Sequence, residues 1–173
     1  MNIFLIGYRC TGKTTVGKSI ALMTDRPFVD SDTPVIKASG RSIRKIIDTE
    51  GWEAFRCKER SVMRRICLND RQVVATGGGV VLCADNVVTM KNTGIIIWLR
   101  ASARTIKERI LRDENTEDLR PALTNKGLVG EIKEILLKRS PYYESASNFY
   151  IHTDGIPVAE ITQTIMHKIK EME

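Results

Sequence analysis

Residues 2–14 join a short apolar run to a glycine-rich loop: Asn2-Ile3-Phe4-Leu5-Ile6-Gly7-Tyr8-Arg9-Cys10-Thr11-Gly12-Lys13-Thr14. The apolar run, residues 2–7, has the length and composition of a buried strand, and residues 13–24 have the apolar spacing of a helix. Between them, Gly7–Thr14 matches the pattern G-x-x-x-x-G-K-[ST]. Glycines in this pattern let the backbone wrap closely around phosphate groups at a helix N-terminus. The segment therefore predicts an α/β fold with a phosphate loop, or P-loop, at its first helix.

Each residue type in this loop has a task in nucleotide chemistry. Backbone N–H groups turn toward the phosphates, the lysine reaches the β- and γ-phosphates, and the hydroxyl of the last residue coordinates Mg²⁺. We therefore expect ATP with Mg²⁺ to bind here, through Cys10, Thr11, Gly12, Lys13, Thr14 and Thr15. A phosphate loop predicts nucleotide binding only, so other residues must decide the reaction.

Strand-length apolar runs alternate with helical patterns along the rest of the chain. Further strands are expected at 27–30, 72–76, 95–99 and 148–152, and further helices at 42–48, 52–68, 102–112, 128–139 and 157–172. Five strands separated by helices predict a parallel sheet covered on both faces, with its site beyond the strand carboxyl ends. Residues 113–127 are polar and long for a loop, which is typical of a functional or mobile segment.

Composition indicates one globular domain over residues 1–173. The chain is 42% hydrophobic and 28% charged, and its net charge of +6 is spread among helices in which Lys and Arg alternate with Glu. We therefore expect no nucleic-acid partner. The apolar runs are too short to cross a bilayer, and no signal-peptide pattern is present. The four cysteines lack metal-ligand spacing, so we expect reduced thiols in a cytoplasmic protein, with no membrane partner.

Three further features lie at the ends of predicted strands. Asp30-Ser31-Asp32 places two carboxylates one residue apart, where Asp30 could hold a magnesium-bound water and Asp32 a substrate hydroxyl. The alternative is that Ser31 or Asp32 caps the next helix. Gly77-Gly78-Gly79 indicates either a ligand close to bare backbone or a turn. Arg56 by itself reads as an ordinary solvated helix charge.

The order of these features resembles the shikimate kinase family. After the phosphate loop and Asp-x-Asp come Glu-Gly-x-x-x-Phe-Arg-x-x-Glu at 50–59, Gly-Gly-Gly at 77–79, Arg-Pro-x-Leu at 120–123 and Lys-Arg-x-Pro-x-Tyr at 138–143. The resemblance implies a three-layer P-loop fold with strand order 2-3-1-4-5 and a mobile lid. It also implies transfer of the ATP γ-phosphate to the 3-hydroxyl of shikimate, a carboxylated cyclohexene triol of aromatic amino-acid synthesis.

The resemblance further implies roles for individual residues. The catalytic set would be Lys13, Asp32 and Arg120, with Asp32 as the candidate base and Arg120 on a lid at about 113–127, between core segments 1–112 and 128–173. Thr14 would bind Mg²⁺ directly and Asp30 through water. Pro157 would pack against adenine, with Arg109 or Arg112 on its other face. The acceptor would bind in the region of about 32–60 and to a set comprising Asp32, Arg56, Gly78, Gly79 and Arg139.

Some positions depart from the family pattern. Arg9-Cys10 stands where a small residue and glycine are usual, so Cys10 must adopt the backbone that a glycine would take. The lid is longer and more acidic than usual, and Ala122 replaces a common leucine. The alternatives are another small kinase of this fold, such as a gluconate or nucleoside-monophosphate kinase, a non-catalytic nucleotide-binding regulator, and a nucleic-acid-binding ATPase. The expected enzyme is a monomer.

Overall fold

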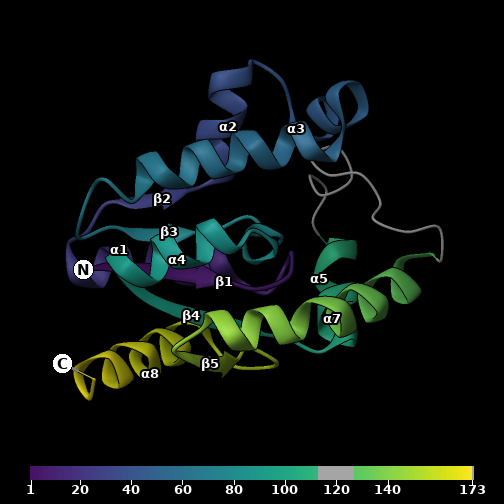
Figure 1. The fold of residues 1–173 in the computed structure, drawn as a ribbon. Helices are drawn as coiled ribbons and strands as arrows, with labels where there is room; N and C mark the ends of the chain where they lie inside the picture. Colours follow the sequence, from purple (N-terminus) through teal and green to yellow (C-terminus); the bar gives the residue numbers. More distant parts are fainter. Residues whose placement is uncertain (113–126, 173) are drawn as a thin grey trace.

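The computed structural model describes residues 1–112 and 127–172, which form a five-stranded sheet between helices (Figure 1). The strands are β1 (Asn2–Ile6), β2 (Phe28–Asp30), β3 (Val73–Ala75), β4 (Gly94–Arg100) and β5 (Phe149–His152). The helices are α1 (Lys13–Thr24), α2 (Asp32–Ser39), α3 (Ile43–Ile66), η1 (Val80–Leu82, a 3₁₀ turn), α4 (Ala84–Thr93), α5 (Ala103–Arg112), α7 (Gly127–Ala146) and α8 (Val158–Lys170).

The sheet has the predicted topology. Its strand order is β2-β3-β1-β4-β5, and all four pairings are parallel. The first strand therefore lies at the centre, where Leu5 has Ala75 of β3 and Ile97 of β4 as its lateral partners. All carboxyl ends meet at one edge of the sheet, and this edge holds the residues that follow each strand.

The two faces of the sheet bury separate cores, as the alternation of strand side chains requires. On β1, Phe4 and Ile6 join a cluster built with α3, α4 and α7, which includes Met63, Met90 and Tyr143. The intervening β1 residues join a cluster on the opposite face, with Val16 and Ile20 of α1 and Ile161, Ile165 and Ile169 of α8. The sheet thus forms the middle layer of three, as predicted.

Two helices were not predicted, because their sequences lack an apolar stripe. Val35 is the buried residue of α2, and α4 buries Met90 together with the polar Asn86. Both helices are short and lie at the edge of the core, so tertiary contacts rather than periodicity specify them.

Two other helices differ in their bounds. The segments predicted at 42–48 and 52–68 lie on either side of a kink in α3 at Gly51, whose φ of 83° is not helical, so the predicted division into two helical segments is confirmed. The helix predicted at 128–139 extends through Pro141 to Ala146, because Tyr143 and Ala146 pack into the core, at 0% and 1% exposure. Burial of those two side chains offsets the cost of a proline within the helix.

Candidate functional site

The phosphate loop connects β1 to α1 and has the tight backbone that its glycines permit. Gly12 has a φ of 98°, and Cys10, although not a glycine, has a left-handed φ of 58°. The sequence predicted that Cys10 must adopt the backbone conformation of the glycine usual at this position, and its left-handed φ agrees with that prediction. Such a residue is strained and needs support from its surroundings.

Lys13 lies with its ammonium inside this loop. The side chain is 8% exposed, and Nζ donates to the carbonyl oxygens of Gly7 at 2.9 Å and Tyr8 at 2.7 Å. The positive charge therefore lies under the backbone that would surround a phosphate. This placement fits the role predicted for the lysine.

Contacts from α5 and from the segment after β5 hold the outer part of the loop. Arg109 donates from Nη1 to the Cys10 carbonyl at 3.2 Å and from Nη2 to the Thr153 carbonyl at 2.7 Å. The Thr153 hydroxyl bonds to the Thr11 carbonyl at 3.2 Å. Arg112, one turn further along α5, is exposed. Of the two candidate arginines, it is therefore Arg109 that contacts the loop.

A cavity opens beside these contacts. It is lined by residues of the phosphate loop and α1, by Arg109, and by the chain from Thr153 to α8: Cys10, Thr11, Gly12, Thr15, Val16, Thr153, Ile156, Val158 and Ile161. Pro157 is the exposed residue before α8, on the loop predicted to pack against adenine, and its neighbours Ile156 and Val158 line the cavity. The cavity is mostly apolar at the end away from the loop, which suits a flat heterocycle.

Thr14 and Asp30 meet at the start of α1. The Thr14 hydroxyl lies 3.3 Å from Oδ2 of Asp30, and Oδ1 of Asp30 accepts the backbone N–H of Asp32 at 3.1 Å. A hydroxyl and one carboxylate are hard oxygen donors of the kind Mg²⁺ prefers, and Mg²⁺ commonly keeps several waters and substrate phosphates as its other ligands. These residues therefore fit the predicted metal position.

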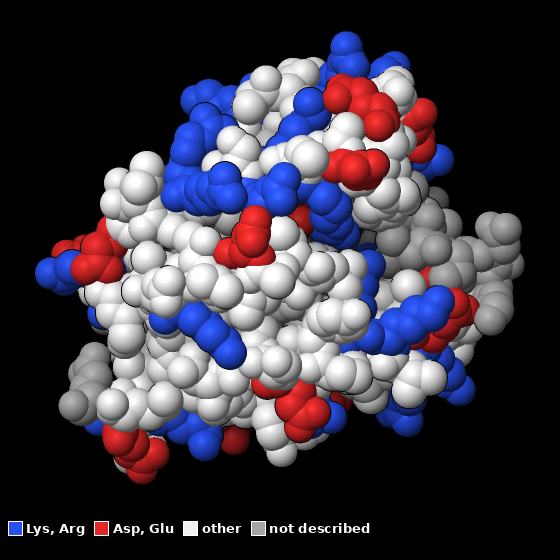
Figure 2. Space-filling view, in the orientation of Figure 1, with Lys and Arg blue, Asp and Glu red and all other residues white. Residues whose placement is uncertain are grey.

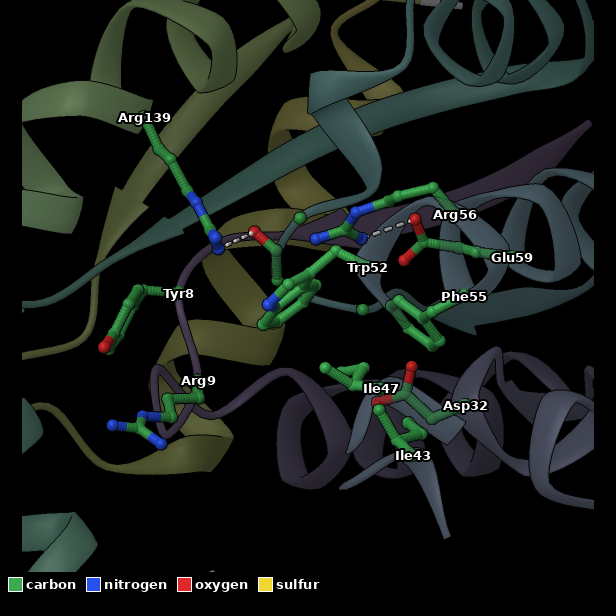
Figure 3. Close-up of a pocket in the computed structure, with 13 residues that line it drawn as sticks. Tyr8, Arg9, Asp32, Ile43, Ile47, Trp52, Phe55, Arg56, Glu59 and Arg139 are labelled. Carbon is green, nitrogen blue, oxygen red and sulfur yellow. Dashed lines mark hydrogen bonds and ion pairs between the residues drawn. The ribbon is translucent and has the colours of Figure 1, made fainter. Parts of the chain in front are cut away.

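A second cavity lies on the other side of the phosphate loop (Figure 3). All five residues predicted for the acceptor line it, although they come from α2, α3, α7 and the turn after β3: Asp32, Arg56, Gly78, Gly79 and Arg139. Figure 3 shows the Arg56 and Arg139 guanidinium groups pointing into the cavity from opposite sides. The fold thus brings two cations, 83 residues apart in sequence, to one cavity.

Arg56 is held in this direction by its neighbours. Nη1 lies 2.6 Å from Oε2 of Glu59, one turn on, whose side chain is 2% exposed. The guanidinium carbon is 5.5 Å from the ring centre of Trp52 and 5.1 Å from that of Phe55. Stacking and an ion pair leave the other edge of the guanidinium directed at the cavity.

The three glycines after β3 make room for side chains of the protein. A Cβ atom at Gly77 would lie 2.8 Å from Oε1 of Glu59 and 2.9 Å from Oδ1 of Asp32, and one at Gly79 would collide with the Arg56 guanidinium. At Gly78 the nearest atom would be the Gly7 carbonyl oxygen, at 3.4 Å. At Gly77 and Gly79 the glycines therefore accommodate the charged residues that line the cavity, where the sequence left a ligand contact and a turn as alternatives.

The turn at Gly78 is also tied to α7. Its carbonyl oxygen accepts from Nη1 of Arg139 at 3.1 Å and from the Tyr143 hydroxyl at 2.5 Å. Tyr143 is fully buried and stacks on Trp98 of β4, with ring centres 5.5 Å apart. These bonds fix the Gly78 backbone relative to the helix that carries Arg139.

The capping alternative for Ser31 and Asp32 holds only in part. Ser31 is the residue before α2 and Asp32 is its first residue, but no side-chain cap bond forms at Ser31. The Ser31 hydroxyl instead accepts the N–H of Gly77 at 3.0 Å. Asp32 lines the cavity from the start of α2.

The sequence assigned no role to Tyr8, Arg9 and Trp52, which line the acceptor cavity, or to Glu131, which lies outside it and bonds to Arg9. Arg9 bonds to Glu131 across 122 positions, and no sequence pattern links them. Trp52 stands four positions before Arg56, the spacing of neighbours on a helix, which was a usable signal. Arg120 and nearly all of the predicted lid lie outside the described residues, and Gly127 is the first residue of α7.

Charged side chains on the face shown in Figure 2 gather over α3, where acidic groups interrupt the Lys and Arg. Arg60 and Arg64 both lie near Asp85 of α4, at 3.6 and 3.5 Å. Among the described residues, no helix combines the length and the apolar character that a membrane span needs.

Comparisons with known proteins agree with one another. The family model described as "Shikimate kinase" matches residues 9–170. The shikimate kinase from Thermodesulfovibrio yellowstonii is 42% identical to the chain, over 99% of this chain and 95% of that protein. The shikimate kinase from Syntrophus aciditrophicus is 39% identical, over 98% of this chain and 91% of that protein. The solved shikimate kinase from Acinetobacter baumannii, in complex with shikimate, is similar at a TM-score of 0.91 and 31% identity, over 99% of this chain and 94% of that one.

A likeness to a gluconokinase from Sinorhizobium meliloti is weaker. Its TM-score is 0.61 at 16% identity, over 99% of this chain and 92% of that one. At that identity the similarity shows a shared fold alone. One of the alternative small kinases thus shares the architecture without matching the sequence.

Proposed function

We propose that the γ-phosphate of ATP passes to the 3-hydroxyl of shikimate across the phosphate loop, since this chain belongs to the shikimate kinase family and phosphorylates shikimate. The observation that carries this proposal is the position of the loop between two cavities. Tyr8 and Arg9 line one, and Cys10, Thr11 and Gly12 line the other. A donor on one side and an acceptor on the other would meet at the end of the loop near Lys13.

On the donor side, the loop and Lys13 would hold the phosphates. Phosphoryl transfer needs charge compensation and alignment more than a strong base, so the buried ammonium of Lys13 would act on the transferring group. The adenine would occupy the cavity between Arg109 and the Ile156–Val158 segment. We propose Arg109, rather than Arg112, as the arginine that flanks it.

Magnesium would be held by the Thr14 hydroxyl, with Asp30 reaching it through water. When bound, it would neutralise charge on the phosphate oxygens of ATP. Asp30 also accepts the backbone N–H of Asp32, so the carboxylate proposed near the metal is bonded to the backbone of the residue proposed to face the acceptor. This connection supports alignment of donor and acceptor.

On the acceptor side, Arg56 and Arg139 would hold the shikimate carboxylate and Asp32 its hydroxyl edge. A planar guanidinium can give a carboxylate two parallel hydrogen bonds, which suits the pair of arginines facing one cavity. The Gly78–Gly79 backbone lies beside the ring position. Asp32 would orient the 3-hydroxyl and accept its proton. Arg120, on the proposed lid, would close over the phosphates and exclude water.

An ADP-release assay tests this function. Shikimate should give rapid ADP release with MgATP, whereas quinate, gluconate and AMP should give little above the rate without acceptor. Formation of shikimate 3-phosphate, identified by mass spectrometry, should match the ADP released. ADP release without phosphorylated shikimate, or a faster rate with gluconate, would overturn the proposal.

We also propose that the protein works as a monomer in the cytoplasm, without a nucleic-acid or membrane partner. Both cavities are lined by one chain, and the basic side chains over α3 have acidic partners such as Asp85. Light scattering across a range of concentrations should give the mass of one chain, 19.5 kDa. A stable dimer mass at the lowest concentration would contradict the monomer.

A further inference from the structure

A buried carboxylate outside both cavities contacts the phosphate loop. Glu131 of α7 is 3% exposed, and its Oε1 lies 2.5 Å from Nη2 of Arg9 and 3.2 Å from the Tyr8 hydroxyl. Arg9 and Tyr8 are consecutive loop residues, whereas Glu131 lies more than 120 positions further along the chain. One oxygen thus joins helix α7 to two adjacent residues of the loop.

The surroundings of this contact are closed to solvent. The Arg9 side chain is 12% exposed, and its buried Nε has no hydrogen-bond partner among the residues that the structure describes. Tyr8 packs against Ile106 and Ile110 of α5 and Ile132 and Ile135 of α7. Because both side chains are largely buried, the pairing of Arg9 with Glu131 is strong and directional. The side chains of residues 8 and 9 are therefore fixed to the α5–α7 pair.

The loop requires such fixation because Cys10 is strained. Arg109 holds the Cys10 carbonyl, and Lys13 holds that of Tyr8. Neither of those bonds holds the side chains of residues 8 and 9, which precede the left-handed Cys10 in the loop. Catalysis depends on loop N–H groups that already point at the phosphates before ATP arrives.

We infer that Glu131 is a positioning residue for ATP, acting through Arg9 and Tyr8 to fix the first half of the phosphate loop. It lines neither cavity and contacts neither substrate position. The inference rests on the proposed nucleotide role of the loop. The competing explanation is that the pair contributes only to fold stability, as buried ion pairs can.

The first test is Glu131→Gln, which removes the charge but keeps the shape. At a temperature well below the melting point of each variant, KM for MgATP and Kd for MgADP should rise about tenfold, and kcat should fall as well. The Kd for shikimate without nucleotide should rise less than the Kd for MgADP, because Tyr8 and Arg9 line that cavity but Glu131 itself does not. Glu134→Gln is the matched control on α7, since Glu134 pairs with Lys138 at 2.7 Å, and it should leave all three constants unchanged.

A double variant guards against simple unfolding of the single one. The double variant Arg9→Met with Glu131→Leu leaves no unpaired buried charge, so it should fold. It lacks the ion pair between residues 9 and 131. It should show the same rise in KM for MgATP, no greater than that of Arg9→Met alone, because both changes break one interaction. Arg9→Lys, which keeps the charge, should recover part of the affinity.

The outcomes are distinct. Wild-type KM and kcat in Glu131→Gln or in the double variant, with only a lower melting temperature, would overturn the inference and leave a stabilising pair. Equal losses of shikimate and nucleotide affinity in Glu131→Gln would also overturn it. Failure of the unaltered protein to bind MgADP would instead overturn the proposed function.

Discussion

The guanidinium of Arg56 occupies the space where a Cβ atom of residue 79 would lie, so Gly79 determines where this arginine can point. Glu59 and the rings of Trp52 and Phe55 restrict it on its other sides. The direction of the charge in the acceptor cavity is thus built jointly by a helix and by the turn after β3. This arrangement gives the first prediction.

Gly79→Ala should displace Arg56 and weaken shikimate binding by about 1.5–3 kcal/mol, the scale of one charge-assisted hydrogen bond. Affinity for MgADP should hardly change. Both are measurable by calorimetric titration. Gly78→Ala is the graded comparison, because its Cβ would approach the Gly7 carbonyl no closer than 3.4 Å. A greater loss of shikimate binding in Gly78→Ala than in Gly79→Ala would contradict this account.

Arg56→Lys tests the carboxylate contact itself. The lysine keeps the charge but loses the planar fork, so shikimate binding should weaken by about 1.5–3 kcal/mol while ATP binding stays constant. A shikimate analogue with an uncharged amide should bind poorly to the unaltered protein and lose little more in the variant. Arg60→Lys, one turn along α3 and near Asp85, is the control. Equal losses for acid and amide would remove Arg56 from the carboxylate site.

Lys13→Ala should reduce kcat by about 10²–10³ or more, because the variant lacks the positive charge that stabilises the transferring phosphoryl group. The structure adds a second effect: the Gly7 and Tyr8 carbonyls lose their donor, so the free energy of unfolding should fall by about 1–2 kcal/mol. Steady-state kinetics and urea denaturation separate the two effects. Lys18→Ala, an exposed position of the same helix, should change neither. Near-normal turnover in the Lys13 variant would refute the phosphate-loop assignment.

Arg109→Ala and Arg112→Ala distinguish the two candidate arginines of α5. Loss of Arg109 frees the Cys10 and Thr153 carbonyls and removes one wall of the donor cavity. KM for MgATP should rise roughly 10-fold or more, corresponding to about 1.5–3 kcal/mol. Loss of the exposed Arg112 should leave KM unchanged. If Arg112→Ala raises KM for MgATP and Arg109→Ala does not, the proposed adenine position is wrong.

Titration of Tyr8 should lower the free energy of unfolding at alkaline pH. Burial, with Glu131 contributing, raises the pKa of its phenol from 10.0 to about 12. Because the folded state retains the proton more strongly than the unfolded state, stability from this group is complete below pH 10.0 and is lost as pH rises toward about 12. Tyr8→Phe should remove this decline. The measurement is the free energy of unfolding of both proteins across the alkaline range; parallel curves would mean that Tyr8 does not titrate as described.

Much of the architecture could be predicted because its signals are local. The apolar run at 2–6 and the glycine loop after it fix β1 and α1, and alternation of Phe4 and Ile6 with their neighbours implies two buried faces. The helices α2 and α4 could not be predicted, because each buries too few apolar residues to produce a period. Their helical state depends on contacts with the rest of the fold.

The acceptor residues were predicted from the order of motifs, not from physics alone. Nothing in the vicinity of Arg56 or Arg139 indicates that the two guanidinium groups share a cavity, since only the folded sheet brings α3 and α7 together. For the same reason, the sequence left a ligand contact and a turn as alternatives at Gly77 and Gly79. Glycine marks a crowded backbone, but the sequence does not reveal whether the crowding group is a ligand or another side chain.

The phosphate loop faces both cavities, and this has a thermodynamic consequence. Each substrate that binds restricts the same short backbone, so the second to arrive gives up less conformational entropy than the first. The two binding equilibria are therefore linked, and the factor by which nucleotide tightens shikimate binding must equal the factor by which shikimate tightens nucleotide binding. A loop shared in this way makes the enzyme responsive to the joint presence of its two substrates, and favours committing ATP only when the acceptor is in place.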